Sequence, residues 1–190
     1  MRAFVISLLV VVGVGTTWAQ GENNSLKDVP FKERVFTGGG FGMGFNNFQD
    51  YVSVSPVIGY SFTRKFMGGV GLSYQFVKYK NVLPGKDVNA NNYGINPFLR
   101  FNVIQGFFLQ TEFEHLNYEF INYPPLETTR EAFNSFLGGG GYIQPIGRNA
   151  AFFAMVLYNF NFQTPAPGEY APYYNPWILR VGVNVGGFIF

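Results

Sequence analysis

The sequence predicts an all-β protein, an eight-stranded antiparallel up-and-down transmembrane β-barrel. Charged residues make up 13 % of the 190 residues, against ~25 % in an average soluble domain, while aromatic residues reach 19 %. Beyond the N-terminus, no apolar run approaches the ~18 residues of a transmembrane helix. Apolar residues instead alternate with small or polar ones, as they do in strands that turn one face to lipid.

The first nineteen residues have the pattern of a secretory signal peptide rather than of a strand. Arg2 provides a positive start, residues 4–14 are apolar, and residues 17–19 form a small-x-small cleavage site before Gln20. An uncleaved membrane anchor is the alternative, and the shortness of the apolar run disfavours it. The predicted mature chain carries 12 basic and 11 acidic residues, a balance that gives no attraction to nucleic acid.

Residues 20–33 are polar and unpatterned, so we expect a periplasmic lead-in followed by the outer-membrane barrel in residues 34–190. Within the barrel, apolar residues alternate with small or polar ones in seven of the eight predicted strands. The exception is the sixth strand, residues 133–144, where the inward and outward faces are ambiguous. The predicted lipid-facing residues are Phe41, Met43, Phe45; Val52, Val54, Pro56, Ile58, Tyr60, Phe62; Val70, Leu72, Tyr74, Phe76; Tyr93, Ile95, Pro97, Leu99, Phe101, Val103; Phe107, Leu109, Thr111, Phe113; Phe152, Val156, Tyr158, Phe160, Phe162; and Trp177, Leu179, Val181, Val183, Val185.

The connections between the predicted strands alternate in length, which is typical of outer-membrane barrels with short periplasmic turns and longer external loops. The short connections lie at residues 63–65, 104–106 and 145–149, and the long ones at 81–91, 120–132 and 163–175. Only the first external loop, at residues 46–50, is short. An even number of strands then puts both ends of the barrel in the periplasm.

Two prolines lie inside predicted strands. Pro56 and Pro97 cannot donate a ladder hydrogen bond, and a closed barrel has no free edge for them. We therefore expect a bulge or a local irregularity of the ladder at each.

Four charged residues have inward parity near the middle of the predicted strands: Arg100, Glu112, Glu114 and Arg180. An eight-stranded barrel is filled by its own side chains, and an unpaired buried charge is costly. The sequence therefore predicts a structural luminal charge network in the periplasmic half of the barrel. A general acid/base pair of the two glutamates is the alternative, and the filled lumen disfavours it.

No residue is predicted to be catalytic, and neither a metal nor a cofactor is expected. Cysteine is absent, which excludes a thiol nucleophile and a cysteine-ligated metal. His115, the only histidine, has lipid-facing parity near the outer surface, where an amphipathic side chain is common. The glycines of residues 38–42 lack the following Lys-Ser/Thr of a phosphate-binding loop.

The chain resembles the small outer-membrane β-barrel proteins of the OmpA/OmpX-like superfamily. The stretches that carry the resemblance are residues 38–42, 53–60, 71–75 and 180–185. The terminal Phe188 and Phe190 resemble the C-terminal signal read by the barrel-assembly machinery. Their parity differs from that of Val185, so either a glycine bulge at residues 186–187 restores the phase or the last strand ends at Val185.

The resemblance implies the cell outer membrane as the location and implies no particular activity. We expect a non-enzymatic barrel with a structural or surface-interaction role, partnered by outer-membrane lipids and by a surface ligand of its external loops. Two alternatives share the fold: a lipid-modifying enzyme of the lipid A deacylase type, whose His-x-Ser pair is missing after His115, and a small pore. A soluble β-sandwich or lipocalin-like barrel is the fold-level alternative, and its surface needs more charge than this chain has.

Overall fold

The computed structural model describes residues 25–45, 47–122, 127–146, 149–166 and 171–186. The predicted signal peptide and the predicted assembly signal at Phe188 and Phe190 lie outside these residues. No helix in the described part of the chain is long and apolar enough to cross a membrane.

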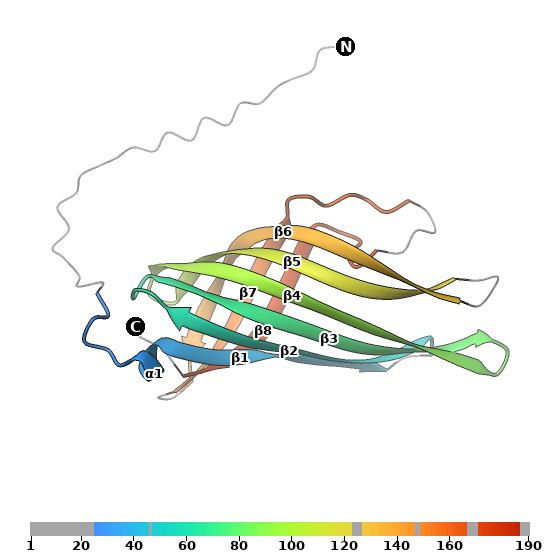
Figure 1. Cartoon of the computed structure of the whole chain (residues 1–190), viewed down its shortest axis with the longest axis horizontal. Helices are drawn as coiled ribbons and strands as arrows, with labels where there is room; N and C mark the ends of the chain where they lie inside the picture. The colour runs from blue at the N-terminus through green and yellow to red at the C-terminus, as the bar shows by residue number, and fades with distance from the viewer. Residues whose placement is uncertain (1–24, 46, 123–126, 147–148, 167–170, 187–190) are drawn as a thin grey trace, which may run out of the picture.

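Eight strands form a closed antiparallel barrel, in which each strand pairs with its sequence neighbours and β1 pairs with β8 (Figure 1). This architecture confirms the predicted fold class. The elements are α1 (Phe31–Arg34), β1 (Val35–Phe45), β2 (Gln49–Ser61), β3 (Phe66–Leu83), β4 (Lys86–Ile104), β5 (Phe107–Asn122), β6 (Glu127–Pro145), β7 (Ala150–Asn159) and β8 (Trp177–Val185).

The two ends of the barrel differ. At the end that carries α1, the connections between β2 and β3, between β4 and β5 and between β6 and β7 are short; this is the short-turn end (Figure 1). At the opposite, long-hairpin end, β3 and β4 stay paired up to Leu83 and Lys86, and β5 and β6 up to Asn122 and Glu127. The predicted loops at residues 81–91 and 120–132 are therefore wrong, because both are mostly strand. In both hairpins the alternation of apolar and polar residues stops while the backbone pairing continues.

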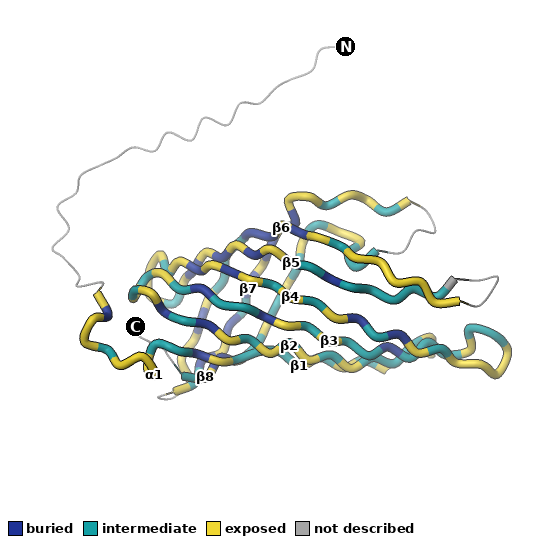
Figure 2. The backbone as a smooth tube through the Cα atoms, in the orientation of Figure 1, coloured by how far each residue is buried: buried dark blue, intermediate teal, exposed yellow. Residues whose placement is uncertain are grey.

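Side-chain burial alternates along the strands as the sequence predicted (Figure 2). In β4, Ile95, Leu99 and Phe101 are exposed on the outer face, whereas Phe98 and Arg100 are buried in the lumen. The ambiguous β6 has its odd-numbered residues inside, with Leu137 and Ile143 buried. The parity of seven strands was thus readable from the sequence, and the glycine-rich sixth strand needed the structure.

Pro56 and Pro97 interrupt the ladder without changing its register. The pairing of β2 with β3 skips from Val54–Tyr74 to Val57–Gly71, and that of β4 with β5 from Ile95–His115 to Phe98–Glu112. Each proline keeps its pairing on the other side, with Gly39 and Val70 respectively. The predicted irregularity is confirmed at both prolines in the form of a local gap rather than a bulge.

The predicted lead-in packs against the short-turn end over residues 25–34. Leu26 is buried, and the Arg34 guanidinium donates to the carbonyl oxygens of Leu26 and Val29 and, at 3.2 Å, to the Tyr60 hydroxyl of β2. The strand after it begins at Val35. The boundary of the lead-in at residue 33 remains a prediction.

Candidate functional site

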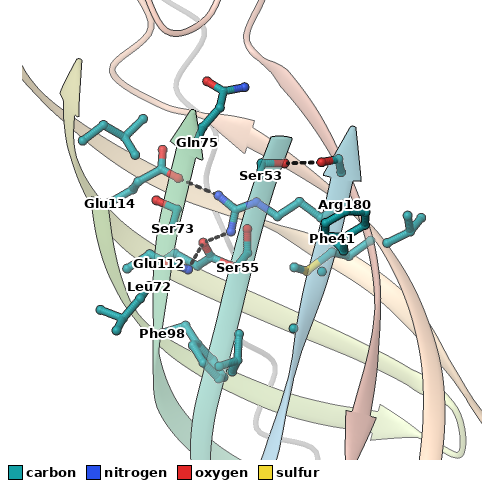
Figure 3. A pocket seen from close by; sticks show the side chains of 18 of the residues that line it. Phe41, Ser53, Ser55, Leu72, Ser73, Gln75, Phe98, Glu112, Glu114 and Arg180 are labelled. Atoms are coloured by element: carbon teal, nitrogen blue, oxygen red, sulfur yellow. Dashed lines mark hydrogen bonds and ion pairs between the residues drawn. The ribbon is translucent and has the colours of Figure 1, made fainter. Parts of the chain in front are cut away.

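The barrel lumen holds a cavity of about 560 Å³, within the range of small-molecule sites (Figure 3). Its walls come mainly from β1 to β5 and β8, and the residue Tyr173 is contributed by the connection between β7 and β8. Hydroxyl, amide and charged groups share the lining with apolar side chains and glycines. The polar residues of the lining are Tyr51, Ser53, Ser55, Ser73, Gln75, Asn92, Tyr93, Asn96, Arg100, Gln110, Glu112, Glu114, Tyr118, Tyr173, Arg180 and Asn184.

Arg180 is the centre of the charged lumen. From β8 its guanidinium reaches across to β5, donating from Nη1 to Glu112 Oε2 at 2.5 Å and from Nη2 to Glu114 Oε1 at 2.7 Å (Figure 3). Glu112 and Glu114 are 2 % and 5 % exposed. Two buried carboxylates next to each other repel, and the shared guanidinium offsets that repulsion. The pairing also ties β8 to β5 across the barrel.

Arg100 makes no ion pair within the described structure, which corrects the simple picture of two arginines facing two glutamates. Its Nε donates to Gln110 Oε1 at 2.6 Å, and the Gln110 amide donates to Glu112 Oε1. The guanidinium lies 4.0 Å from the centre of the Phe108 ring, a cation–π contact. In place of a carboxylate, Arg100 thus contacts the side-chain amide of Gln110, which connects it to Glu112, and the face of the Phe108 ring.

All four predicted residues are connected in one chain of polar contacts, running from Arg100 through Gln110 and Glu112 to Arg180 and Glu114. Arg100 is close to the short-turn end, and Glu114 lies between the pairs Phe98–Glu112 and Ile95–His115, next to the middle of β4 on the side of the short-turn end. The location of the network in the periplasmic half stays a prediction.

The structure adds residues that the sequence analysis missed. The Tyr173 hydroxyl donates to Glu114 Oε2 at 2.6 Å, and Asn96 Nδ2 donates to Glu112 Oε2 at 3.2 Å. Gln110 and Asn96 have inward parity, so their place in the lumen was readable, although their partners were not. Tyr173 lies in the connection between β7 and β8, where apolar and polar residues do not alternate. Nothing in the sequence therefore indicated that its side chain enters the barrel.

Aromatic residues close the lumen below the cavity, toward the short-turn end. Phe98 and Phe153 each lie 5.7 Å from the Arg100 guanidinium, measured to the ring centre, and Phe36 packs against Phe98. Phe108, Leu137 and Leu157 are fully buried in the same layer. Phe36, Phe98 and Phe153, the aromatic layer, line the cavity on the side of the short-turn end.

His115 lies on the outer face of β5. Its Nδ1 is 2.7 Å from Asn134 Oδ1, and its Nε2 is 3.2 Å from Asn117 Nδ2. Both hydrogen-bond partners are side-chain amides, whereas an activated hydrolytic centre needs a nucleophile next to the base. Over the described residues, no group of three or more His, Asp or Glu side chains is arranged to hold a metal ion.

The comparisons with known proteins are limited to the fold. No family model matches the chain, and no curated protein matches its sequence. Among solved structures, the chain is similar to the crystal structure of the N-terminal β-barrel domain of OprF from Pseudomonas aeruginosa, with 18 % identity and a TM-score of 0.45. The alignment covers 80 % of this chain and 97 % of that one.

Proposed function

We propose that this protein is a bacterial outer-membrane barrel whose role is structural or surface-interacting rather than enzymatic. The observation that carries the proposal is the apolar outer face of a closed barrel. Large hydrophobic side chains are exposed on every strand, among them Phe41, Ile58, Leu72, Leu99, Leu109, Phe136, Val156 and Leu179. In water such a surface would aggregate, whereas in lipid it is the solvated face of a membrane barrel.

The difference between the two ends of the barrel indicates how it is oriented in the membrane. Short turns face the periplasm in barrels of this kind and longer segments face outward, so we place α1 in the periplasm and the long hairpins outside. The β3–β4 hairpin is held by an ion pair of Lys78 with Asp87 at 3.0 Å. The Asn81 amide donates to Asp87, and this hydrogen bond together with Lys78 lowers the pKa of the Asp87 carboxyl. We propose these paired strands as the surface that contacts an external ligand.

The closed lumen supports a barrel that is not a pore. The aromatic layer around Arg100 blocks the short-turn end, and the ion pairs of Arg180 cross the barrel above it. The carboxylates are equally unsuited to acid/base catalysis. Both oxygens of Glu112 and both of Glu114 already accept hydrogen bonds from side chains.

The His115 environment provides a test of the enzyme alternative. We expect His115→Ala to leave the acylation of lipid A unchanged, because its partners are amides and no hydroxyl is placed for attack. Mass spectrometry of lipid A from cells expressing wild type, His115→Ala or no protein checks this. A mass difference of one acyl chain between wild type and deletion would establish an enzyme and overturn the proposal.

Membrane fractionation with heat-modifiable gel mobility tests the location. We expect the protein in the outer-membrane fraction, with a mature chain that begins at Gln20 and a band that shifts on boiling because the folded barrel resists detergent. Recovery in the soluble periplasmic fraction, or Met1 retained on N-terminal sequencing, would contradict the proposal.

A further inference from the structure

The seam between β1 and β8 is the incomplete part of the barrel wall. Only three residue pairs join these strands: Thr37–Val185, Gly38–Asn184 and Gly39–Val183. Residues 40–45 of β1 remain paired with β2, and residues 177–182 of β8 remain paired with β7. All of these residues are described, so each strand continues toward the long-hairpin end with one edge lacking a ladder partner.

The position of this seam makes its open edges costly. Phe41, Leu179 and Val181 are exposed on the outer faces of the two strands. The seam therefore lies within the apolar outer surface that we place in the bilayer. Backbone groups within a bilayer must be satisfied by protein, by trapped water or by a polar ligand, since lipid tails offer them no hydrogen bonds. The seam therefore calls for a polar partner on its luminal side.

The cavity lies directly behind the seam. Its lining includes residues 39–42 of β1 and residues 179–181 of β8, which are consecutive positions on both sides of the gap. Gly40 and Gly42 have inward parity, but a Cβ built on Gly42 would lie 2.6 Å from Ser53 Oγ, so of the two glycines Gly40 is the one with free space beside it. A Cβ built on Gly40 would meet only the Val181 carbonyl oxygen, at 3.4 Å.

The polar groups of the cavity are chemically specific. Arg100 and Arg180 together carry as much charge as Glu112 and Glu114, so the ionised groups of the lining sum to zero and favour neither an anion nor a cation. The hydroxyls of Tyr51, Ser55 and Ser73 form no hydrogen bond within the described structure. Figure 3 shows Ser55 and Ser73 on the luminal side, next to the Arg180–glutamate pairs. Unused hydroxyls in a charge-balanced cavity suit an uncharged head group that both donates and accepts hydrogen bonds.

We propose that the seam between β1 and β8 is a lateral entrance through which the cavity takes the uncharged, polyhydroxyl head of an amphiphile from the bilayer. The hydroxyls of the head meet Ser55, Ser73 and the unpaired backbone edges of the seam, and the tail stays on the outer face next to Phe41 and Val181. The site rests on the proposed membrane location, because a seam facing water needs no amphiphile. The aromatic layer around Arg100 makes the cavity a dead end, so the amphiphile is bound there and not conducted to the other side.

Reversible closure of the seam tests this proposal. The native chain has no cysteine, so Phe41→Cys with Val181→Cys, which continue the register of the existing pairs, gives one defined disulfide. The matched control is Thr37→Cys with Val185→Cys, at a position where the ladder is already closed. The probe is an octyl glucoside with a photoreactive group on the sugar, in phosphatidylcholine vesicles, and labelled peptides are identified by mass spectrometry.

We expect the probe to label peptides containing Ser55 or Ser73, and oxidised Phe41→Cys/Val181→Cys to lose this labelling until a reductant restores it. The oxidised control pair should label like wild type. Gly40→Val, which narrows the slot without a cross-link, should also lose labelling. Heat-modifiable mobility of each variant shows whether the barrel is intact, which separates failure of this site from failure of the proposed function.

Three results would overturn the proposal. Labelling that persists in the oxidised seam variant would mean that the probe enters from the long-hairpin end. Stronger labelling by a phosphate-headed or ammonium-headed octyl probe would contradict an uncharged head group. A disulfide that forms between two molecules, rather than within one, would identify a second copy of the chain as the partner of these strand edges.

Discussion

Arg180→Met should destabilise the barrel by about 3–5 kcal/mol, since two buried carboxylates would lose the guanidinium they share. Glu112 and Glu114 would then face each other with only the hydrogen bonds of Gln110, Asn96 and Tyr173. Urea unfolding of the protein refolded in phosphatidylcholine vesicles measures the loss. Methionine replaces the unbranched stem of arginine as far as the Nε position, so the packing of the stem is kept while the charge and its hydrogen bonds are lost.

The matched control is Arg100→Met, which removes the same charge from the same lumen. Arg100 contacts an amide and aromatic rings rather than a carboxylate, so its loss should cost about 1–3 kcal/mol. Lys86→Ala at the exposed hairpin tip should change stability by less than about 0.5 kcal/mol. Adding Glu112→Gln and Glu114→Gln to Arg180→Met should recover much of the loss. Equal small effects for the two arginines would contradict the buried network.

Leu99→Arg should cost about 2–4 kcal/mol, as an arginine at the bilayer midplane does in membrane barrels. Leu99 is exposed on the outer face of β4, midway along the run of lipid-facing residues from Tyr93 to Val103. Tyr93→Arg, on the same face but toward the long-hairpin end, should cost about 0–1 kcal/mol because the side chain reaches the interface.

Vesicle unfolding of these two variants compares depth, because both introduce the same side chain on the same strand. Tyr93→Arg also removes the contact of the Tyr93 ring with the Arg130 guanidinium, at 4.8 Å, so Tyr93→Ala gives the reference cost at that position. If this face met water, each substitution would stay within about 0.5 kcal/mol. A cost at Tyr93 that equals the cost at Leu99 would also contradict the proposed depth of the apolar outer surface in the bilayer.

How far the sequence predicted the structure depended on whether a segment alternates between apolar and polar residues. Along β4, β5 and β8 the outer face is apolar, so the alternation of Leu99 with Arg100, or of Val181 with Arg180, identified the inward residues. The hairpin strands at residues 81–91 and 120–132 do not alternate and have the composition of loops, although their backbones are paired. The alternating pattern therefore marks only the part of each strand that has an apolar outer face.

The sequence predicted which residues belong to the candidate site, but not which of them contact each other. Parity placed Arg100, Glu112, Glu114 and Arg180 in the lumen, but a period of two does not say which side chains meet across a barrel. Arg100 met Phe108 and Gln110 instead of a carboxylate. Tyr173 reached Glu114 from an unpatterned connection, and the open seam between β1 and β8 depends on a register that no local pattern encodes.

The solvent that surrounds each outward residue of β4 tests the proposed membrane barrel most directly. Single cysteines at Asn91, Tyr93, Ile95, Leu99, Phe101 and Val103 are labelled with a nitroxide in the cysteine-free chain, refolded in phosphatidylcholine vesicles. Collision rates with oxygen, which concentrates in lipid, and with a water-soluble nickel complex are then compared. We expect the collision rate with oxygen, relative to that with nickel, to be highest at Leu99 and to fall toward both Asn91 and Val103. Nickel access that is high and uniform along the strand would show that this face meets water, and would contradict the membrane barrel.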